Sequence, residues 1–482
     1  MIDLVIIVLY MGGMIGIGFY ARAKARTESD FLVAGRRLGP FYYGGTMAAL
    51  VLGGGATLGG IGLGYQKGFA GVWIAFAFGI GVAIVSLLLA PLINRLKVYT
   101  VSQMLQLRYG EVGTVVSGVV MLGYTLLIAV TSTIAYGAIF SVLFAIGKVP
   151  AILLGSSVVI IYSVLGGMWS ITLTDMVQFI VKTVSIFFVV LPLALTRAGG
   201  FEGLVAKLPE SAFSFGDGSW IFTYVILYMP TMVVGQDLWQ RVFTARNDKV
   251  ARWAGFGASL YCFAYGLAGA LIGMSARVLL PGITTRDAVY AEVVRHVLPA
   301  GLAGLVVAGA LAAIMSTSSG ALIATATVAK QDILGGLRAA RGRGQAVPDG
   351  SHDEVGGSRW FIVVFGIVMA VVSCVLHDVV AALTLASDFL VGGLMVPVLG
   401  GILWRRATAL GATTSIIAGI VATLGTMAVI HDIYANTPIY VGLGVSFISF
   451  IAVSLLDKPA PAAVLAVWDA RSGAGKRAGI AS

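Results

Sequence analysis

The stretch GGGATLGGIGLG, from Gly53 to Gly64, lies inside an apolar segment that spans residues 40–65. Glycine weakens helices, and in a membrane helix consecutive glycines favour close packing or local unwinding. A second apolar segment, 219–240, contains YMPTMVVGQD (228–237), with Pro230 deep inside it. Proline removes a helical hydrogen bond and kinks or breaks the helix. Both segments are therefore predicted to be interrupted helices.

The composition places these segments in a membrane. The chain has 482 residues, of which 59% are hydrophobic and 11% are charged, whereas about 25% of the residues of a soluble protein are charged. Apolar runs long enough to cross a bilayer recur along the chain. We count thirteen: 2–21, 40–65, 70–94, 114–146, 149–167, 171–196, 219–240, 252–279, 299–329, 359–379, 380–404, 408–430 and 437–456. The chain is thus predicted to be an all-α, polytopic membrane protein.

Basic residues predict the orientation of these segments. With the N-terminus outside and the C-terminus in the cytoplasm, 23 of the 31 Lys and Arg residues lie in cytoplasmic segments and 7 lie outside. Cytoplasmic loops normally hold this excess. The net charge of +10 is therefore attributed to loops beside the lipid bilayer of the cell membrane, and nucleic acid is not expected as a partner. No obligate protein partner is inferred.

The segments are predicted to form two five-helix halves, each of which begins with an interrupted helix. Interrupted helices at matching positions of two halves indicate the binding site of a transporter. No soluble catalytic domain is recognised, so the protein is not expected to be an enzyme. The expected parts are an extra N-terminal helix (1–25), the two halves (26–200 and 201–406), a cytoplasmic loop (331–358), two C-terminal helices (407–458) and a cytoplasmic tail (459–482).

A run of hydroxyl residues lies in the apolar stretch LAAIMSTSSGALIATATVAKQDI, residues 311–333. Ala313, Ser316 and Thr317 share one helical face, at positions i, i+3 and i+4. One backbone carbonyl and two hydroxyls on this face supply three of the roughly five oxygens that a Na⁺ site needs, since hard cations prefer oxygen ligands. The alternative is that Ser and Thr bond to a neighbouring helix. The paired interruptions favour the Na⁺ interpretation.

Three charged residues lie well inside the spans: Asp175, Lys182 and Asp388. Such residues are costly in a bilayer and mark functional sites or internal ion pairs. Lys182 is two turns beyond Asp175 and roughly 16 Å into its span, by the rise of 1.5 Å per residue. Its ammonium either replaces Na⁺, which would make transport Na⁺-independent or proton-coupled, or binds a substrate carboxylate, or pairs with Asp175 or Asp388. Retained Na⁺ dependence is the expectation.

The sequence resembles the sodium:solute symporter family in several stretches that occur in family order. They are SDFLVAGRRLGP (29–40), YTVSQMLQLRYG (99–110), YSVLGGMWSITLTDMVQ (162–178), GQDLWQRVFTARN (235–247), LAAIMSTSSGALIATATVAKQDI (311–333) and WRRATALGA (404–412). The resemblance implies a LeuT-like five-plus-five inverted repeat, with one N-terminal and two C-terminal extra helices. It also implies uptake driven by Na⁺ as the coupling ion, through alternating access.

The resemblance also implies ligand sets. The principal Na⁺ site of the family maps onto the carbonyls of Ala49, Leu52 and Ala313 and the hydroxyls of Ser316 and Thr317. A second Na⁺ site, present in some members, maps onto Asp175, Ser316 and Ser319. Gly320 stands where a further serine of that second site is expected.

The candidate polar lining of a substrate pocket is Thr57, Thr131, Lys182, Tyr228 and Asp388. Ala56 stands where sugar transporters of the family carry a polar residue, so a sugar is disfavoured. A small organic solute, with a short monocarboxylate or a pantothenate-like acid as the leading candidate, is expected. The alternatives are a proton-coupled symporter that uses Lys182, a membrane sensor and a channel.

Overall fold

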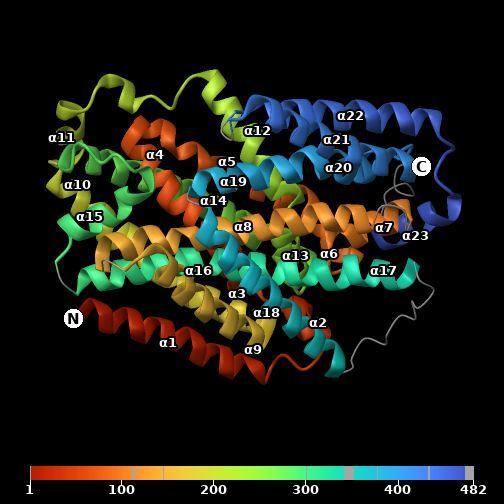
Figure 1. Cartoon of the computed structure of the whole chain (residues 1–482), viewed down its shortest axis with the longest axis horizontal. Coiled ribbons are helices and arrows are strands. Elements are labelled where there is room, and N and C mark those ends of the chain that lie inside the picture. Colours follow the sequence, from red (N-terminus) through yellow and green to blue (C-terminus); the bar gives the residue numbers. More distant parts are fainter. Residues whose placement is uncertain are drawn as a thin grey trace.

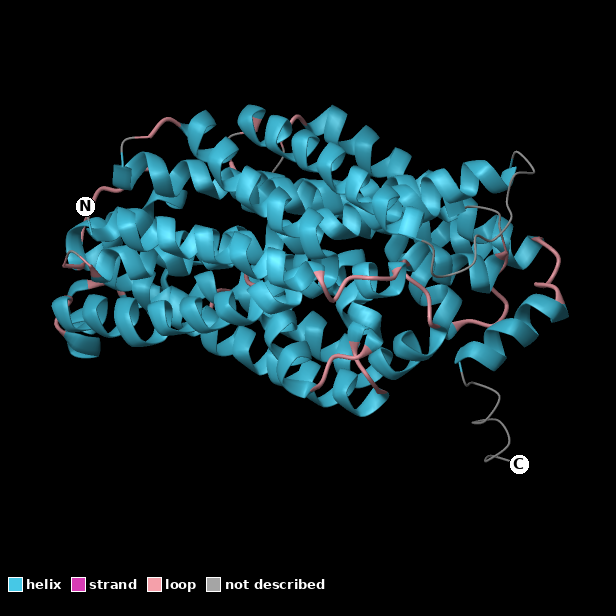
Figure 2. Cartoon of the chain, turned by 90° about the horizontal axis from the view of Figure 1, so that it is seen from below, coloured by secondary structure: helices cyan, strands magenta, loops and turns pink. Residues whose placement is uncertain are grey.

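The described part of the chain is helical throughout. The computed structural model describes residues 2–110, 114–144, 146–299, 301–340, 352–376, 378–432 and 435–472. These residues form no β-strand, and Leu38 and Ala245 form one isolated β-bridge. Most helices lie along the long axis of the molecule (Figure 1), and they form one bundle in the perpendicular view (Figure 2).

The α-helices follow one another along the chain with short 3₁₀ or π segments between some of them. They are α1 (Ile2–Arg22), α2 (Glu28–Val33), α3 (Pro40–Val51), α4 (Gly60–Lys67), α5 (Trp73–Ile84), α6 (Ala90–Leu96), α7 (Val101–Tyr109), α8 (Thr114–Phe144), α9 (Lys148–Thr183), α10 (Leu191–Arg197), α11 (Gly200–Lys207), α12 (Gly218–Val234), α13 (Gln236–Thr244), α14 (Asp248–Leu279), α15 (Val289–Val297), α16 (Leu302–Val328), α17 (Gly335–Ala340), α18 (His352–Val375), α19 (Val379–Leu390), α20 (Val396–Leu403), α21 (Ala409–Ile430), α22 (Thr437–Leu456) and α23 (Ala462–Ser472).

Ten helical runs of the described residues are long and apolar enough to cross a membrane, and a bent pair makes eleven. The two longest runs are long enough for two crossings each. Lys148–Arg197 has 50 residues, or about 75 Å of helix, whereas the hydrocarbon core of a bilayer is about 30 Å thick. This run contains Gly167 at φ 53°, and the 42-residue run Gly55–Leu96 contains Gly68 at φ 65°. Division at these glycines matches the predicted segments, although the number thirteen stays a prediction.

Both predicted interruptions are present. α3 ends at Val51, Leu52 is non-helical at φ −103° and ψ 69°, and a π segment over Gly55–Gly59 leads into α4. α12 contains Pro230 and ends before Gly235, where the chain bends by 44° into α13. The backbone groups at each bend are not all used within a helix, so they are available to side chains or ions.

Helix α16 is at the centre of the bundle. Its residues are buried without exception from Val306 to Val328, and it packs against α1, α3, α8, α9 and α18. The outer helices have the opposite pattern: Leu9, Phe188 and Leu456 are 70%, 72% and 89% exposed. Figure 1 shows α1 and α22 at opposite edges of the bundle. An apolar exterior around a core with hydroxyl residues suits a protein embedded in lipid.

Contacts between loops agree with the predicted sides of the membrane. Three contacts join segments that are predicted to be cytoplasmic: Arg95 with Asp248 at 2.5 Å, Arg108 Nη2 with the Arg405 carbonyl at 3.1 Å, and Lys330 with Glu28 at 2.5 Å. Arg197 Nη1 and the His296 carbonyl, at 3.1 Å, join two predicted outer segments, and Arg286 joins Asp378, at the predicted outer end of segment 359–379, at 3.5 Å. The N-terminal end of α1 and helix α23 lie at opposite ends of the molecule (Figure 1). Which end faces the cytoplasm stays a prediction.

Two predicted irregular segments are partly helical. In the predicted loop 331–358, the helix that includes α16 continues through a π segment into α17, and α18 begins at His352; residues 341–351 lie outside the described residues. In the predicted tail 459–482, α23 packs against α6 and α7, and residues 473–482 lie outside the described residues. The buried Trp468 explains why an alanine-rich tail forms a docked helix there.

Candidate functional site

The hydroxyl face of α16 meets the interruption that follows α3. The Ser316 hydroxyl has one hydrogen and two carbonyl acceptors within reach of Oγ, that of Ala49 at 2.8 Å and that of Ala313 at 3.0 Å. Thr317 Oγ1 donates to the Leu50 carbonyl. The structure therefore brings the helix break and the hydroxyl face together, as the predicted principal Na⁺ site requires.

The ammonium of Lys182 lies on the same carbonyls. Its Nζ donates to the carbonyls of Ala48 at 3.1 Å, Ala49 at 3.0 Å and Leu52 at 3.4 Å. Lys182 is completely buried, with Nζ 5.9 Å from the centre of the Tyr265 ring. Lys182 forms no ion pair among the described residues, so the structure does not show the third alternative, pairing with Asp175 or Asp388. Carbonyls of the predicted principal Na⁺ site hold a side-chain cation.

A second side-chain cation lies beside Asp175. Arg241 Nη2 is 3.1 Å from Asp175 Oδ2, and both side chains are 0% exposed. Thr46 also donates a hydrogen bond to Asp175 Oδ2. Charge counting places Arg241 in a predicted cytoplasmic segment, and the structure adds that it is buried, as is every residue of α13.

The predicted second Na⁺ site therefore has a different set of contacts. Ser319 Oγ donates to the Ser316 carbonyl at 3.2 Å, within its own helix. At Gly320, an added Cβ would lie 2.8 Å from Arg241 Nη2. The absence of a side chain at Gly320 thus leaves room for the guanidinium that pairs with Asp175.

The other predicted polar residues do not converge on one point. Thr57 Oγ1 is 2.9 Å from the Tyr265 hydroxyl, and Thr131 Oγ1 donates to the Leu127 carbonyl of its own helix. The Tyr228 hydroxyl is 3.5 Å from Thr384 Oγ1. Asp388 is buried, and its carboxylate oxygens accept no hydrogen bond from the described residues. These four side chains have different neighbours and do not form one polar site.

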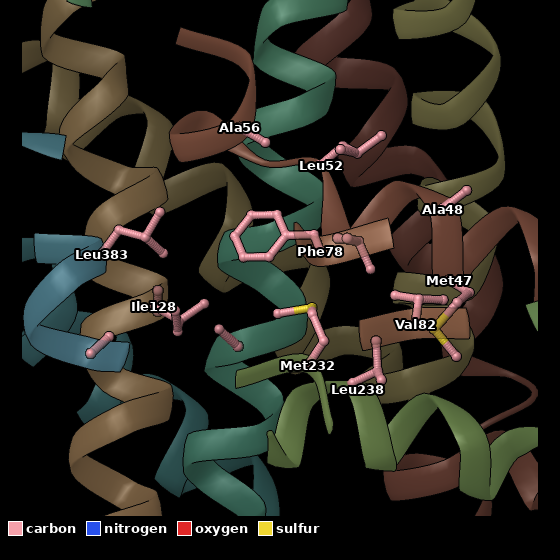
Figure 3. Packing of buried hydrophobic residues seen from close by; sticks show 14 of the residues in the cluster. Met47, Ala48, Leu52, Ala56, Phe78, Val82, Ile128, Met232, Leu238 and Leu383 are labelled. Atoms are coloured by element: carbon pink, nitrogen blue, oxygen red, sulfur yellow. The ribbon is translucent and has the colours of Figure 1, made fainter. Parts of the chain in front are cut away.

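A small cavity of about 30 Å³, which we call the central cavity, lies between the two interruptions. Its size corresponds to only one or two water molecules. Apolar side chains supply most of its wall, and Figure 3 shows Phe78, Ile128, Met232 and Leu383 gathered below Leu52 and Ala56 in that view. The polar lining comes from Thr131, Ser132, Asp237 and Thr317. The sequence reasoning found Thr131 and Thr317 but missed the apolar wall, because buried Phe and Met residues occur throughout the spans.

A larger cavity of about 760 Å³ opens at the predicted outer end. Tyr228 and Thr384 lie in its lining, so it approaches the helix α12 interruption. Its charged lining residues are Lys67, Asp217, Arg277 and Arg286. This outer vestibule, as we call it, carries three basic residues and one acidic residue.

Arg286 of the vestibule has two acidic neighbours, Asp378 at 3.5 Å and Asp287 at 3.8 Å. Burial raises the pKa of Asp287, and the adjacent Arg286 guanidinium opposes that rise. Lys67 and Arg277 are therefore the more available positive charges for an incoming anion.

An all-helical membrane bundle with two interrupted helices and a central hydroxyl-bearing helix defines a secondary transporter. The comparisons with known proteins specify which kind. The sodium:solute symporter family matches residues 31–419, and the chain belongs to this family. It is therefore a symporter rather than an enzyme, with Na⁺ as its coupling ion and a small-molecule solute as its cargo.

Several relatives match almost the whole chain. A sodium/proline symporter of Staphylococcus aureus (strain bovine RF122 / ET3-1) is 25% identical over 484 residues, which cover 94% of this chain and 92% of the relative. The sodium/proline symporter of Staphylococcus aureus strain JH9 is 25% identical over 490 residues, with the same coverage.

Solved structures confirm the LeuT-like fold. A Na⁺-coupled sialic acid symporter in a substrate-bound, outward-open state superposes with a TM-score of 0.84 at 19% identity, over 96% of this chain and 98% of that one. Mhp1, a nucleobase-cation-symport-1 family transporter in a closed conformation, gives a TM-score of 0.53 at 14% identity, over 92% of this chain and 98% of that one.

Proposed function

We propose that this symporter imports a small organic acid together with Na⁺ by alternating access, and that Ala49, Leu52, Ala313, Ser316 and Thr317 form its principal Na⁺ site. The contact between the hydroxyl face of α16 and the break after α3 carries this proposal. The carbonyls and hydroxyls that meet there are the hard oxygen ligands that Na⁺ requires. These carbonyls and hydroxyls lie inside the bundle, where backbone oxygens bind an ion without competition from bulk water.

The outer vestibule and the central cavity support an acid as the solute. Lys67 and Arg277 give the vestibule a positive charge, which attracts anions and raises their local concentration. The wall of Phe78, Ile128, Met232 and Leu383 suits a short apolar portion of the solute. A sugar would leave most of its hydroxyls unpaired against this wall, at a cost in binding free energy.

Proline is a specific candidate because two relatives are sodium/proline symporters. Proline combines a carboxylate with a small apolar ring. The carboxylate agrees with the basic outer vestibule, and the ring agrees with the apolar wall of the central cavity. Its ammonium group needs an acceptor, and Asp237 lines the central cavity. A monocarboxylate without an ammonium group needs no such acceptor.

Uptake into proteoliposomes tests the proposal. The panel contains short monocarboxylates, a pantothenate-like acid, proline, sialic acid and a hexose, each under an inward Na⁺ gradient or an inward proton gradient. We expect Na⁺-driven accumulation of one carboxylate, with no accumulation of its neutral amide. Equal accumulation of acid and amide would refute the carboxylate assignment.

Proton coupling is a second candidate, and the contacts of Lys182 favour it. A buried ammonium on the carbonyls of Ala49 and Leu52 can stand in place of Na⁺ and titrate during the cycle. Accumulation driven by the proton gradient in Na⁺-free medium would support this candidate over Na⁺ symport.

A further inference from the structure

An apolar groove lies on the exposed side of the bundle, apart from the solute path. It has a volume of about 710 Å³ and is lined by α12, α20, α22 and the last residue of the π segment before α20. Each lining residue is apolar, aromatic or glycine, and none of them lines the outer vestibule or the central cavity. Phe222, Leu403 and Phe447 of this lateral groove, as we call it, are 58%, 76% and 56% exposed. An exposed apolar hollow of this kind marks a binding surface.

The lateral groove has the length of a lipid acyl chain. α22 lines it from Tyr440 to Ile451, which is about 17 Å of helix at the usual rise per residue. One leaflet contributes half of the hydrocarbon core, or about 15 Å. At the predicted cytoplasmic end, Trp404 lines the groove with its ring centre 5.7 Å from that of Phe450. Indole rings are typical of the boundary between hydrocarbon and headgroups, so the groove starts at such a boundary and extends through about one leaflet.

Basic side chains lie directly beyond this end of the lateral groove. Arg406 Nη2 donates to the carbonyls of Leu455 at 3.2 Å and Asp457 at 2.6 Å, which holds the guanidinium beside the end of α22. Arg406 Nη1 has no hydrogen-bond partner among the described residues. Lys458 is exposed at the same end of α22. Within the described part of the chain, neither of these two basic side chains forms an ion pair.

The two ends of the lateral groove differ in charge. The six-residue loop between α21 and α22, at the predicted outer end, contains one aspartate and neither lysine nor arginine. At the predicted cytoplasmic end, three basic residues outnumber two acidic ones: Arg405, Arg406 and Lys458 against Asp457 and Asp469. Arg405 and Asp469 pair with each other at 2.7 Å. Basic clusters at the cytoplasmic end of membrane helices attract anionic lipid headgroups.

We propose that the lateral groove binds an anionic phospholipid, with an acyl chain along α22 and the headgroup phosphate beside Arg406 and Lys458. The apolar wall removes the chain from polar surroundings, and the two cations balance the charge of the phosphate. This inference goes beyond the proposed function and depends neither on the Na⁺ site nor on the identity of the solute.

Helix α12 connects the lipid site to the solute path. Phe222 and Ile226 line the lateral groove, whereas Thr223 and Leu227, one residue further in each case, line the outer vestibule. α12 ends at the second helix interruption, before Gly235. A bound acyl chain therefore supports the interrupted helix on the side opposite the solute path.

Photolabelling of the purified protein in detergent tests the proposal. The probe is phosphatidylglycerol with a diazirine in one acyl chain, and mass spectrometry locates the labelled residues. We expect label in residues 395–404 and 440–451. Unlabelled phosphatidylglycerol should displace the probe at a concentration at least tenfold lower than phosphatidylcholine with the same chains.

Gly444→Leu fills the lateral groove without a clash, because an added Cβ at Gly444 meets nothing within 4 Å. Labelling of residues 395–404 and 440–451 should fall at least fivefold in this variant. Gly425→Leu on α21 is the matched control, since an added Cβ there also meets nothing within 4 Å and the residue does not line the groove. This control should keep the wild-type labelling.

Arg406→Gln/Lys458→Gln tests the headgroup contact. This variant should be labelled with no preference for phosphatidylglycerol over phosphatidylcholine, whereas Arg246→Gln/Lys249→Gln, which removes two exposed basic residues elsewhere on the predicted cytoplasmic side, should keep the tenfold preference. If the first double variant does not fold, Lys458→Gln alone should lower the preference at least twofold.

Three results would overturn the proposal. Equal displacement by the two lipids in the wild type would show that the groove does not select an anionic headgroup. Label of equal intensity on α1 and α21 would show that only the general lipid layer around the bundle is reached. Cross-links between two copies of the chain at residues 440–451, without lipid label there, would assign the groove to a dimer.

Discussion

The buried pair of Asp175 and Arg241 gives the sharpest prediction about the candidate second Na⁺ site. The two side chains are 3.1 Å apart at Oδ2 and Nη2, and both are 0% exposed. Removal of one partner of a buried ion pair leaves an uncompensated charge and costs about 3–5 kcal/mol. Asp175→Asn and Arg241→Met should each lower the free energy of unfolding by about this amount.

A double-mutant cycle measures how much of this loss of stability comes from the interaction between the two side chains. The double variant Asp175→Asn/Arg241→Met has no unpaired charge, so it should be more stable than the sum of the single changes predicts, by about 0.5–3 kcal/mol. Unfolding by denaturant in detergent supplies the free energies. The control is Asp469→Asn, which breaks a surface pair with Arg405, whose side chain is 72% exposed; that change should cost about 0–1 kcal/mol.

The competing result concerns the number of ions transported. If Asp175 binds a second Na⁺ during transport, Asp175→Asn will keep wild-type stability and the ratio of Na⁺ to solute will fall by one. That combination would refute the structural interpretation of the pair. Lower stability with an unchanged ratio would support it.

Three further predictions address the ion site, the cavity and the vestibule. Ser316→Ala/Thr317→Val removes two of the proposed Na⁺ ligands, so half-saturation of uptake by Na⁺ should rise at least tenfold while solute affinity at saturating Na⁺ changes little; unchanged Na⁺ dependence in a well-folded variant would contradict the assignment. Phe78→Ala enlarges the central cavity, so competition assays should show tighter binding of acids with longer chains relative to short ones. Lys67→Gln/Arg277→Gln should slow uptake of an anion at low ionic strength and have little effect in high salt, since salt screens exposed charges; the same loss at both ionic strengths would show that steering is not their role.

The sequence predicts the parts of the site that depend on local chemistry. The three consecutive glycines from Gly53 and the proline at position 230 weaken their helices whatever the neighbouring helices are. Both interruptions therefore follow from residue type. Ser316 and Thr317 share a face because of helical periodicity. The interruptions and the hydroxyl face are confirmed as structural features, whereas Na⁺ binding by them stays a proposal.

Contacts between distant segments were harder to predict. Lys182 reaches carbonyls more than 130 residues earlier in the chain, and this contact depends on how α9 is rotated against α3. Charge counting places Arg241 in the predicted cytoplasmic segment after residues 219–240, but it cannot show that the side chain is buried. Its burial depends on the bend at Gly235, which directs α13 into the bundle.

The contacts of Lys182 and Arg241 have the same physical effect. Lys182 places a positive charge at the proposed principal Na⁺ site, and Arg241 places another beside the aspartate of the candidate second site. The two charges differ in chemistry, because an arginine stays protonated in proteins, whereas a buried lysine can lose its proton. Arg241 can therefore act only as a fixed charge that holds Asp175. Lys182 can carry a positive charge or lose it, so it is the residue on which the proton-coupled alternative of the proposed function depends.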